Sequence, residues 1–249
     1  MKIDPLYQFK IHTLFPFFIG KFNISFTNAA LFMIITVVVV IGWLCLGIRS
    51  SSQKLVPNRL QASVELLFNF INDLSQSYMG PKGCVFTPYI LSIFLFILGG
   101  NLLGLLPKAH TFTSQLSVTL GLALITFTII TIIGFTKHGW GFFKIFMPRG
   151  VPLYIAPLLV PVEVISYLSR PVSLSIRLFA NMVAGHIMLK IFSIFSAILV
   201  TTKWLGLSAI LPIIMNIGVF GFELLVAVLQ AYVFVVLTCI YLNDALHLH

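Results

Sequence analysis

The chain has 249 residues, of which 59% are hydrophobic and only 8% are charged, and its mean hydropathy is +1.07. This composition excludes an ordinary soluble domain and predicts a membrane protein. The formal net charge is +9, but the basic residues are scattered and no aromatic platform lies among them in a polar domain, so we expect no nucleic-acid partner.

Five apolar segments are long enough to cross a bilayer, which takes about 20 helical residues. They follow a short, phenylalanine-rich lead-in at residues 1–26. We therefore predict an all-α integral membrane protein that forms one transmembrane domain over 1–249. The five predicted crossings are residues 28–48, 88–107, 116–136, 156–200 and 204–243.

Residues 58–79 have a different pattern. Asn58 after Pro57 is a good N-cap, and Gln61 three residues later favours a helix start. Apolar residues then recur at helical spacing as far as Tyr78, while the remaining positions are too polar for a crossing. We predict an amphipathic helix that lies along the membrane surface or against a partner. Its polar positions include Glu65, Asn69, Asp73 and Gln76.

The second and third crossings are joined by the short linker 108–115, which predicts an antiparallel helical hairpin. Gly100 and Gly104 allow close helix approach. Asn101 at membrane depth either forms an interhelical hydrogen bond or lines a water path. Residues 137–152 are basic and aromatic, which predicts an interfacial loop with a solvated His138. The three cysteines have no ligand spacing, so we expect reduced, buried thiols and no metal site.

The last two segments are too long for an upright crossing. Pro161 and Pro171 would kink the first, but no polar loop follows either of them. A helix of about 44 residues is about 66 Å long, whereas the bilayer core is about 30 Å thick. It must therefore tilt by roughly 60°, beyond the usual range. We predict two long, strongly tilted helices that form a hairpin closed near residues 201–203.

Polar residues of the first tilted helix form a stripe about 27 Å long when placed at about 100° and 1.5 Å per residue. An arginine at membrane depth costs roughly 2.5–3.5 kcal/mol, so ionisable groups there usually mark ion pathways. The alternative is a purely structural role, in which the helix packs inside a bundle and its serines bond to their own backbone. His186 points about 180° away from Arg177 and should face another helix. The stripe comprises Glu163, Ser166, Arg170, Ser173, Arg177 and Asn181, and on the next helix Asn216, Glu223 and Gln230 recur every seven residues.

Five motifs occur in the order found in one known family and are spread over nearly the whole length of the chain. They are DPLYQF (4–9), GNLLGLLP (100–107), SRPVSLSIRLFANMVAGH (169–186), GFELLVAVLQAY (221–232) and YLNDA (241–245). The chain resembles subunit a of F-type ATP synthases, most closely the mitochondrial and α-proteobacterial type. Many other bacterial members have a carboxylate at the position of His186 and an imidazole at that of Glu223, so this sequence has the two exchanged.

The resemblance implies a proton-conducting stator subunit of the membrane sector, whose two tilted helices face a rotating ring of c subunits. A peripheral-stalk b-type subunit, other Fo subunits and the lipid bilayer are the further implied partners. By itself the chain would be no enzyme and would need no cofactor. The implied location is the mitochondrial inner membrane or the α-proteobacterial plasma membrane, as a multi-pass protein.

The resemblance also implies two aqueous half-channels that do not meet. Arg177 would separate them and deprotonate the ring carboxylate, since an arginine cannot itself relay protons. Asn101 is a further candidate. The outer-side path would use His186, Glu223, Asn181, Gln230 and Asn216, and the inner-side path would use Glu163, Ser166, Ser173 and Arg170.

Several alternatives stay open at this level. Instead of a role in the proton path, His186 could be a core imidazole and Gln230 could form a helix–helix contact. Arg170 is either a second electrostatic element or a partner of Glu163. Two other functions compete for the whole chain. One is a secondary transporter, although such proteins usually contain internal repeats and this chain has none. The other is a haem-bearing respiratory subunit, although only one histidine lies deep in an apolar run. We expect the side chains of His186 and Glu223 to meet directly or through one water.

Overall fold

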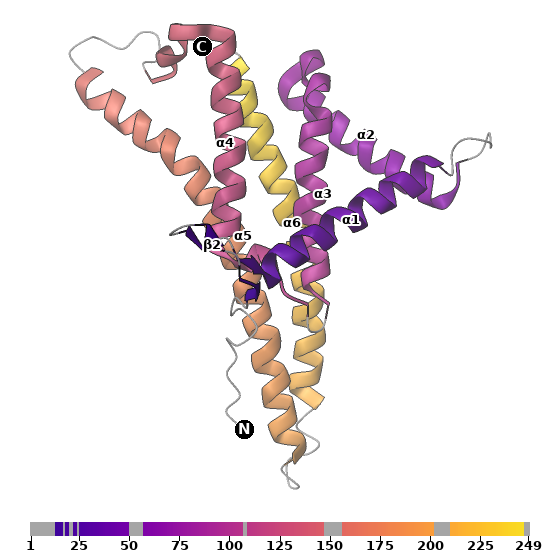
Figure 1. The fold of residues 1–249 in the computed structure, drawn as a ribbon. Helices are drawn as coiled ribbons and strands as arrows, with labels where there is room; N and C mark the ends of the chain where they lie inside the picture. The colour runs from indigo at the N-terminus through magenta and orange to yellow at the C-terminus, as the bar shows by residue number, and fades with distance from the viewer. Residues whose placement is uncertain are drawn as a thin grey trace. The chain divides into compact units, whose positions relative to one another are not determined.

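The computed structural model describes residues 13–16, 18–19, 22–23, 25–49, 57–106, 109–146, 156–201 and 210–246. Six α-helices dominate this part of the chain (Figure 1), and five of them are long and apolar enough to cross a membrane. The predicted all-α membrane fold is confirmed. The helices are α1 (Asn28–Arg49), α2 (Arg59–Met79), α3 (Thr87–Gly104), α4 (Leu116–His138), α5 (Ala156–Thr201) and α6 (Ile210–Leu246).

Short strands precede α1, where the sequence predicted only a lead-in. β1 (Thr13–Phe15) pairs antiparallel with β4 (Phe26–Thr27), and β2 (Phe18–Ile19) pairs antiparallel with β3 (Phe22–Asn23). Phenylalanine, isoleucine and threonine favour extended backbone. Pairings of two or three residues are too short to produce the alternating pattern by which strands are recognised in a sequence.

The ends of the helices follow local signals. The Asn58 side chain accepts a hydrogen bond of 2.8 Å from the Arg59 amide and caps α2 as expected. The helix α3 ends at Gly104, before the expected Pro107, because helices usually end ahead of a proline. By contrast, α5 continues through Pro161 and Pro171. The predicted hairpin closure and the segment 204–209 lie outside the described residues, as do residues 147–152 of the predicted loop.

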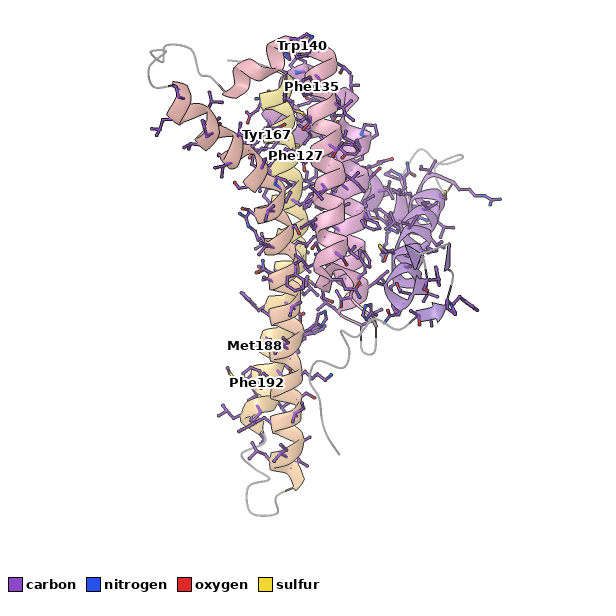
Figure 2. All side chains as sticks on the ribbon, turned by 60° about the vertical axis from the view of Figure 1, so that its left-hand side comes forward. Phe127, Phe135, Trp140, Tyr167, Met188 and Phe192 are labelled. Carbon is purple, nitrogen blue, oxygen red and sulfur yellow. The ribbon has the colours of Figure 1, made fainter. Side chains whose placement is uncertain are left out.

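The end of α4 differs from the predicted solvated segment. The chain continues into a 3₁₀ helix, η4 (Gly139–Phe146), in which Trp140 is exposed (Figure 2). His138 is only half-exposed, and its Nε2 lies 3.2 Å from the Leu246 carbonyl oxygen, so the expectation of a solvated side chain was wrong. Lys137 Nζ donates to the same oxygen at 2.8 Å. Carbonyls at a helix C-terminus lack intrahelical partners and attract basic side chains.

The expectation of three buried thiols is corrected as well. Cys239 is buried, but Cys45 on α1 and Cys84 in the 3₁₀ helix η2 (Gly80–Val85) are exposed. Because a lipid-facing helix surface is as apolar as a core, an apolar segment does not reveal which of its residues are buried.

The chain divides into two compact units, each assembled from three separate segments. Unit 1 comprises Met1–Trp43, Leu95–Gln115 and Leu178–Ala231, and unit 2 comprises Leu44–Phe94, Leu116–Arg177 and Tyr232–His249. In unit 1 the C-terminal part of α5 runs beside the N-terminal part of α6 (Figure 1).

Within unit 2 the beginning of α5 packs on α4. The Phe127 and Tyr167 rings lie close together (Figure 2), with centroids 4.7 Å apart. The hydroxyl groups of Thr131 and Tyr167 are 3.0 Å apart.

Candidate functional site

In unit 1, α5 and α6 bring an imidazole and a carboxyl group together. His186 Nδ1 lies 3.5 Å from Glu223 Oε1, and the Glu223 side chain is only 2% exposed. Gly185 makes room for this approach, since a Cβ at that position would lie 2.7 Å from Glu223 Oε1. The expected contact is confirmed, and His186 faces another helix as its angular position predicted.

The second ring nitrogen of His186 has a partner that sequence reasoning missed. Thr111 Oγ1 lies 2.7 Å from His186 Nε2, and the same hydroxyl donates a hydrogen bond of 3.2 Å to the Gly104 carbonyl oxygen. Thr111 belongs to the connector between α3 and α4, where the sequence predicted only a short linker. A single threonine in a linker gives no periodic signal that would point to a site.

Amides tie the same helices together. Asn181 Nδ2 donates a hydrogen bond of 2.9 Å to Gln230 Oε1, which links α5 to α6. Asn101 Nδ2 donates to the Ala227 carbonyl oxygen at 3.2 Å, so of its two open roles the interhelical hydrogen bond is present. Gln230 likewise makes a helix–helix contact.

Several buried polar atoms of unit 1 have no hydrogen-bond partner among the described residues. Buried polar groups normally have a partner, and ordered water provides it where the chain does not. A cavity of about 560 Å³ lies against Asn181 and Glu223, and Met188 of α5 also lines it. Met188 is labelled in Figure 2. The unpartnered atoms are Asn101 Oδ1, Thr113 Oγ1, Asn216 Oδ1, both carboxylate oxygens of Glu223, and Gln230 Nε2.

In unit 2, Arg170 pairs with Asp244 and not with Glu163. Its Nη1 lies 3.3 Å from Asp244 Oδ2, and the guanidinium carbon lies 4.8 Å from the Tyr241 ring centroid and 5.5 Å from that of Tyr167. Spacing along one helix could not find this partner, because Asp244 comes from α6. The alternative prediction, in which Arg170 pairs with Glu163, was therefore wrong.

The other predicted inner-side residues do not form a cluster. Glu163 is half-buried, and Ser166 and Ser173 are exposed. Among the described residues, no hydrogen bond or ion pair joins these three side chains to one another. Ser175, which the predicted stripe omits, is buried, and its Oγ lies 3.3 Å from Thr119 Oγ1.

Arg177 is the last residue of the unit 2 segment of α5, and its side chain is exposed. It forms no ion pair with any residue in the described ranges. Its neighbours Val172 and Ile176 are exposed apolar residues. The helix therefore presents an exposed cation beside exposed apolar side chains and the exposed Ser173.

Comparison with known proteins identifies the family. The ATP synthase A chain family matches residues 30–243. The chain belongs to this family. ATP synthase subunit a of Mesorhizobium japonicum (strain LMG 29417 / CECT 9101 / MAFF 303099) is 51% identical over 247 residues, which cover 99% of this chain and 97% of that protein. That of Rhizobium rhizogenes (strain K84 / ATCC BAA-868) is 49% identical over 248 residues, covering 99% and 98%.

A third relative, "ATP synthase subunit a 1" of Brucella anthropi, is 48% identical over 248 residues, covering 99% of each chain. These relatives come from α-proteobacteria, so the resemblance seen in the motifs is confirmed. With its five apolar helices, the chain is a multi-pass membrane protein. Family membership also removes the secondary transporter and the haem-bearing subunit as alternatives.

Proposed function

We propose that this chain conducts protons through the membrane sector of an ATP synthase by two offset aqueous half-channels that face a rotating ring of c subunits. The observation that carries the proposal is Arg177, an exposed cation without an ion-pair partner among the described residues. An arginine in that position costs roughly 2.5–3.5 kcal/mol at the bilayer centre. A carboxylate on a neighbouring chain, here a ring subunit, would offset this cost.

Arg177 acts as a fixed charge in this proposal. An arginine stays protonated in proteins and has no acceptor, so it cannot pass a proton on. A carboxylate about 4 Å away gains about 4 kcal/mol at an effective dielectric constant of 20, which favours its deprotonated form by about a thousandfold. A protonated ring carboxyl group therefore releases its proton beside Arg177. The same charge repels a proton that would cross directly between the half-channels.

The outer-side half-channel is assigned to unit 1. Its support is the contact between His186 and Glu223 and the cavity that reaches Glu223. Carboxylate and imidazole groups exchange protons near neutral pH, and water completes the partners of buried polar atoms. Asn101, Asn181, Asn216 and Gln230 would orient that water, since they carry the other polar atoms of this region.

The inner-side half-channel is assigned to Glu163, Ser166 and Ser173 on α5. Glu163 provides a carboxylate about 21 Å along the helix from Arg177, at a helical rise of about 1.5 Å per residue. Arg170 would be a second fixed charge on this path. Its pairing with Asp244 supports that role, because a cation held by a carboxylate is kept in one position.

The proposed partners follow from the same surfaces. The ring would contact segments 156–200 and 204–243, and the remaining contacts are with a peripheral-stalk b-type subunit, other Fo subunits and lipid. One elementary charge that moves through 100 mV carries about 2.3 kcal/mol. Several protons are therefore needed for each ATP.

Substitution of Arg177 in the complete ATP synthase tests the proposal. Arg177→Ala and Arg177→Lys should both abolish proton-driven ATP synthesis in vesicles while the subunit still assembles. Lysine retains a charge, but it can lose its proton when desolvated and lacks the planar guanidinium group. Lys190→Gln on the same helix is the matched control and should retain most of the synthesis rate. Full synthesis by the Arg177→Lys complex would overturn the proposal.

A further inference from the structure

The connector between α3 and α4 is unusual because it is both polar and buried. Loops normally lie at the surface, where water satisfies their backbone and side chains. Here a run of five polar side chains has exposed fractions of 9% or less. Several of its members find hydrogen bonds inside the protein, as the contacts of His110 with Gln115 and of Thr111 with His186 show. The five residues are His110, Thr111, Thr113, Ser114 and Gln115.

Two glycines of α3 admit this connector. A Cβ at Gly104 would lie 2.5 Å from Thr111 Cγ2 and 2.6 Å from Thr111 Oγ1, and a Cβ at Gly100 would collide with the Phe112 ring. From the sequence, both glycines are predicted to allow close helix approach. They also accommodate the connector, and Gly104 lets Thr111 reach His186.

The hydrogen bonds of Thr111 determine which nitrogen of His186 carries the proton. A threonine hydroxyl has one hydrogen, and Thr111 donates it to the Gly104 carbonyl oxygen. In this arrangement its oxygen is free to accept from His186 Nε2–H at 2.7 Å, a distance that by itself fits either tautomer. In the neutral ring Nδ1 is therefore unprotonated, and Nδ1 is the nitrogen that lies 3.5 Å from Glu223 Oε1.

We propose that Thr111 is a positioning residue of the outer-side path, which holds His186 in the Nε2–H tautomer so that Nδ1 exchanges protons with Glu223. In the forward step imidazolium Nδ1–H gives its proton to the Glu223 carboxylate, which leaves neutral imidazole and a carboxylic acid. Nε2–H donates to Thr111 before and after the step, so the ring keeps its orientation. This inference rests on the proposed function of the subunit.

The distance between the two titrating groups explains why orientation matters. A hydrogen bond between nitrogen and oxygen is usually about 2.7–3.2 Å long. At 3.5 Å, His186 Nδ1 and Glu223 Oε1 are a small movement away from proton transfer. Without the Thr111 hydroxyl the imidazole ring can rotate and turn Nδ1 away from the carboxyl group.

The test removes the hydroxyl in the complete ATP synthase. Thr111→Val keeps the side-chain volume and should lower proton-driven ATP synthesis about tenfold, the factor that corresponds to loss of a hydrogen bond of about 1.4 kcal/mol. Thr111→Ser keeps the hydroxyl and should restore the rate to within about twofold. Thr113→Val is the matched control. It removes a buried threonine hydroxyl of the same connector that has no hydrogen-bond partner in the described ranges.

Three results would overturn the inference. The first is full ATP synthesis by the Thr111→Val complex. The second is a loss of synthesis in the Thr113→Val complex equal to that in the Thr111→Val complex. The third is a loss of synthesis in the Thr111→Ser complex as large as that in the Thr111→Val complex. If the valine variant does not assemble, Thr111→Ala removes the same hydroxyl with a smaller side chain. Retained synthesis by Arg177→Lys would overturn the proposed function itself. A block by Arg177→Lys together with an active Thr111→Val complex would overturn the role of Thr111 alone.

Discussion

His186 and Glu223 place an imidazole and a carboxyl group in contact within two apolar helices. An isolated ionisable group in such surroundings stays neutral and exchanges protons poorly. Two such groups in contact share a proton and titrate as a pair. The exchanged identities in many other bacterial members of the family are consistent with this, because a relay pair works in either order.

Exchanging the two residues provides a direct test of the pair. The double variant His186→Glu with Glu223→His should retain more proton-driven ATP synthesis than either single variant, since only the double variant keeps one imidazole and one carboxyl group. The rates are measured in vesicles at equal amounts of assembled complex. A double variant slower than both single variants would contradict a shared role.

Glu163 is expected to matter less than Arg177. It lies about 21 Å along the helix from Arg177, too far for direct pairing, and it would act by attracting protons or water. Glu163→Gln should therefore slow coupled proton flow without stopping it, as measured by ATP-driven acidification of vesicles. A complete block in a fully assembled complex would show that Glu163 has an obligatory role.

At the scale of secondary structure elements, Gly185 determines how closely α5 approaches α6. A Cβ there would lie 2.7 Å from Oε1 and 2.8 Å from Cδ of Glu223. The colliding atoms belong to the end of a flexible side chain, so the helices themselves need not separate. The requirement for glycine thus comes from the position of the carboxyl group more than from backbone conformation.

Gly185→Ala should displace the Glu223 carboxyl group and reduce ATP synthesis about tenfold, a change of about 1.4 kcal/mol in the barrier. The stability of the subunit should change little, because the higher helix propensity of alanine, about 1 kcal/mol, offsets the cost of displacing the Glu223 side chain. Gly221→Ala on α6 is the control, since a Cβ there would meet nothing within 4 Å. Equal rates for the two variants would mean that Gly185 has no special importance.

At the scale of the whole molecule, unit 2 is held together by contacts between distant parts of the chain. Arg170 and Asp244 are 74 residues apart and form an ion pair of 3.3 Å beside the Tyr241 ring. Both side chains are partly exposed, at 25% and 36%, so solvent screening limits the strength of the pair.

Asp244→Asn should lower the stability of the subunit by about 1 kcal/mol, the upper range for a partly exposed ion pair. The thermal unfolding midpoint of the assembled complex should fall accordingly. Asp73→Asn on α2 is the control, because the exposed Asp73 side chain forms no ion pair with described residues. An unchanged midpoint for Asp244→Asn would show that the ion pair adds nothing to stability.

The sequence by itself determined the helices and the candidate residues that they carry. Long apolar runs and the Asn58 cap are local signals, and each acts through hydrogen bonds or burial within a few residues. The angular positions of His186 and Glu223 follow from the helical repeat, which is why their contact was predictable. The family motifs added the proposed roles.

Only the tertiary structure decided which residues complete the sites. Thr111 and His186 are 75 residues apart, and the partner of Arg170 is Asp244 and not Glu163 on its own helix. No periodicity encodes such pairs, because they depend on how far one helix slides and turns against another. That register is determined by close packing of side chains over the whole interface, including glycines such as Gly104 and Gly185 whose missing Cβ leaves the necessary space.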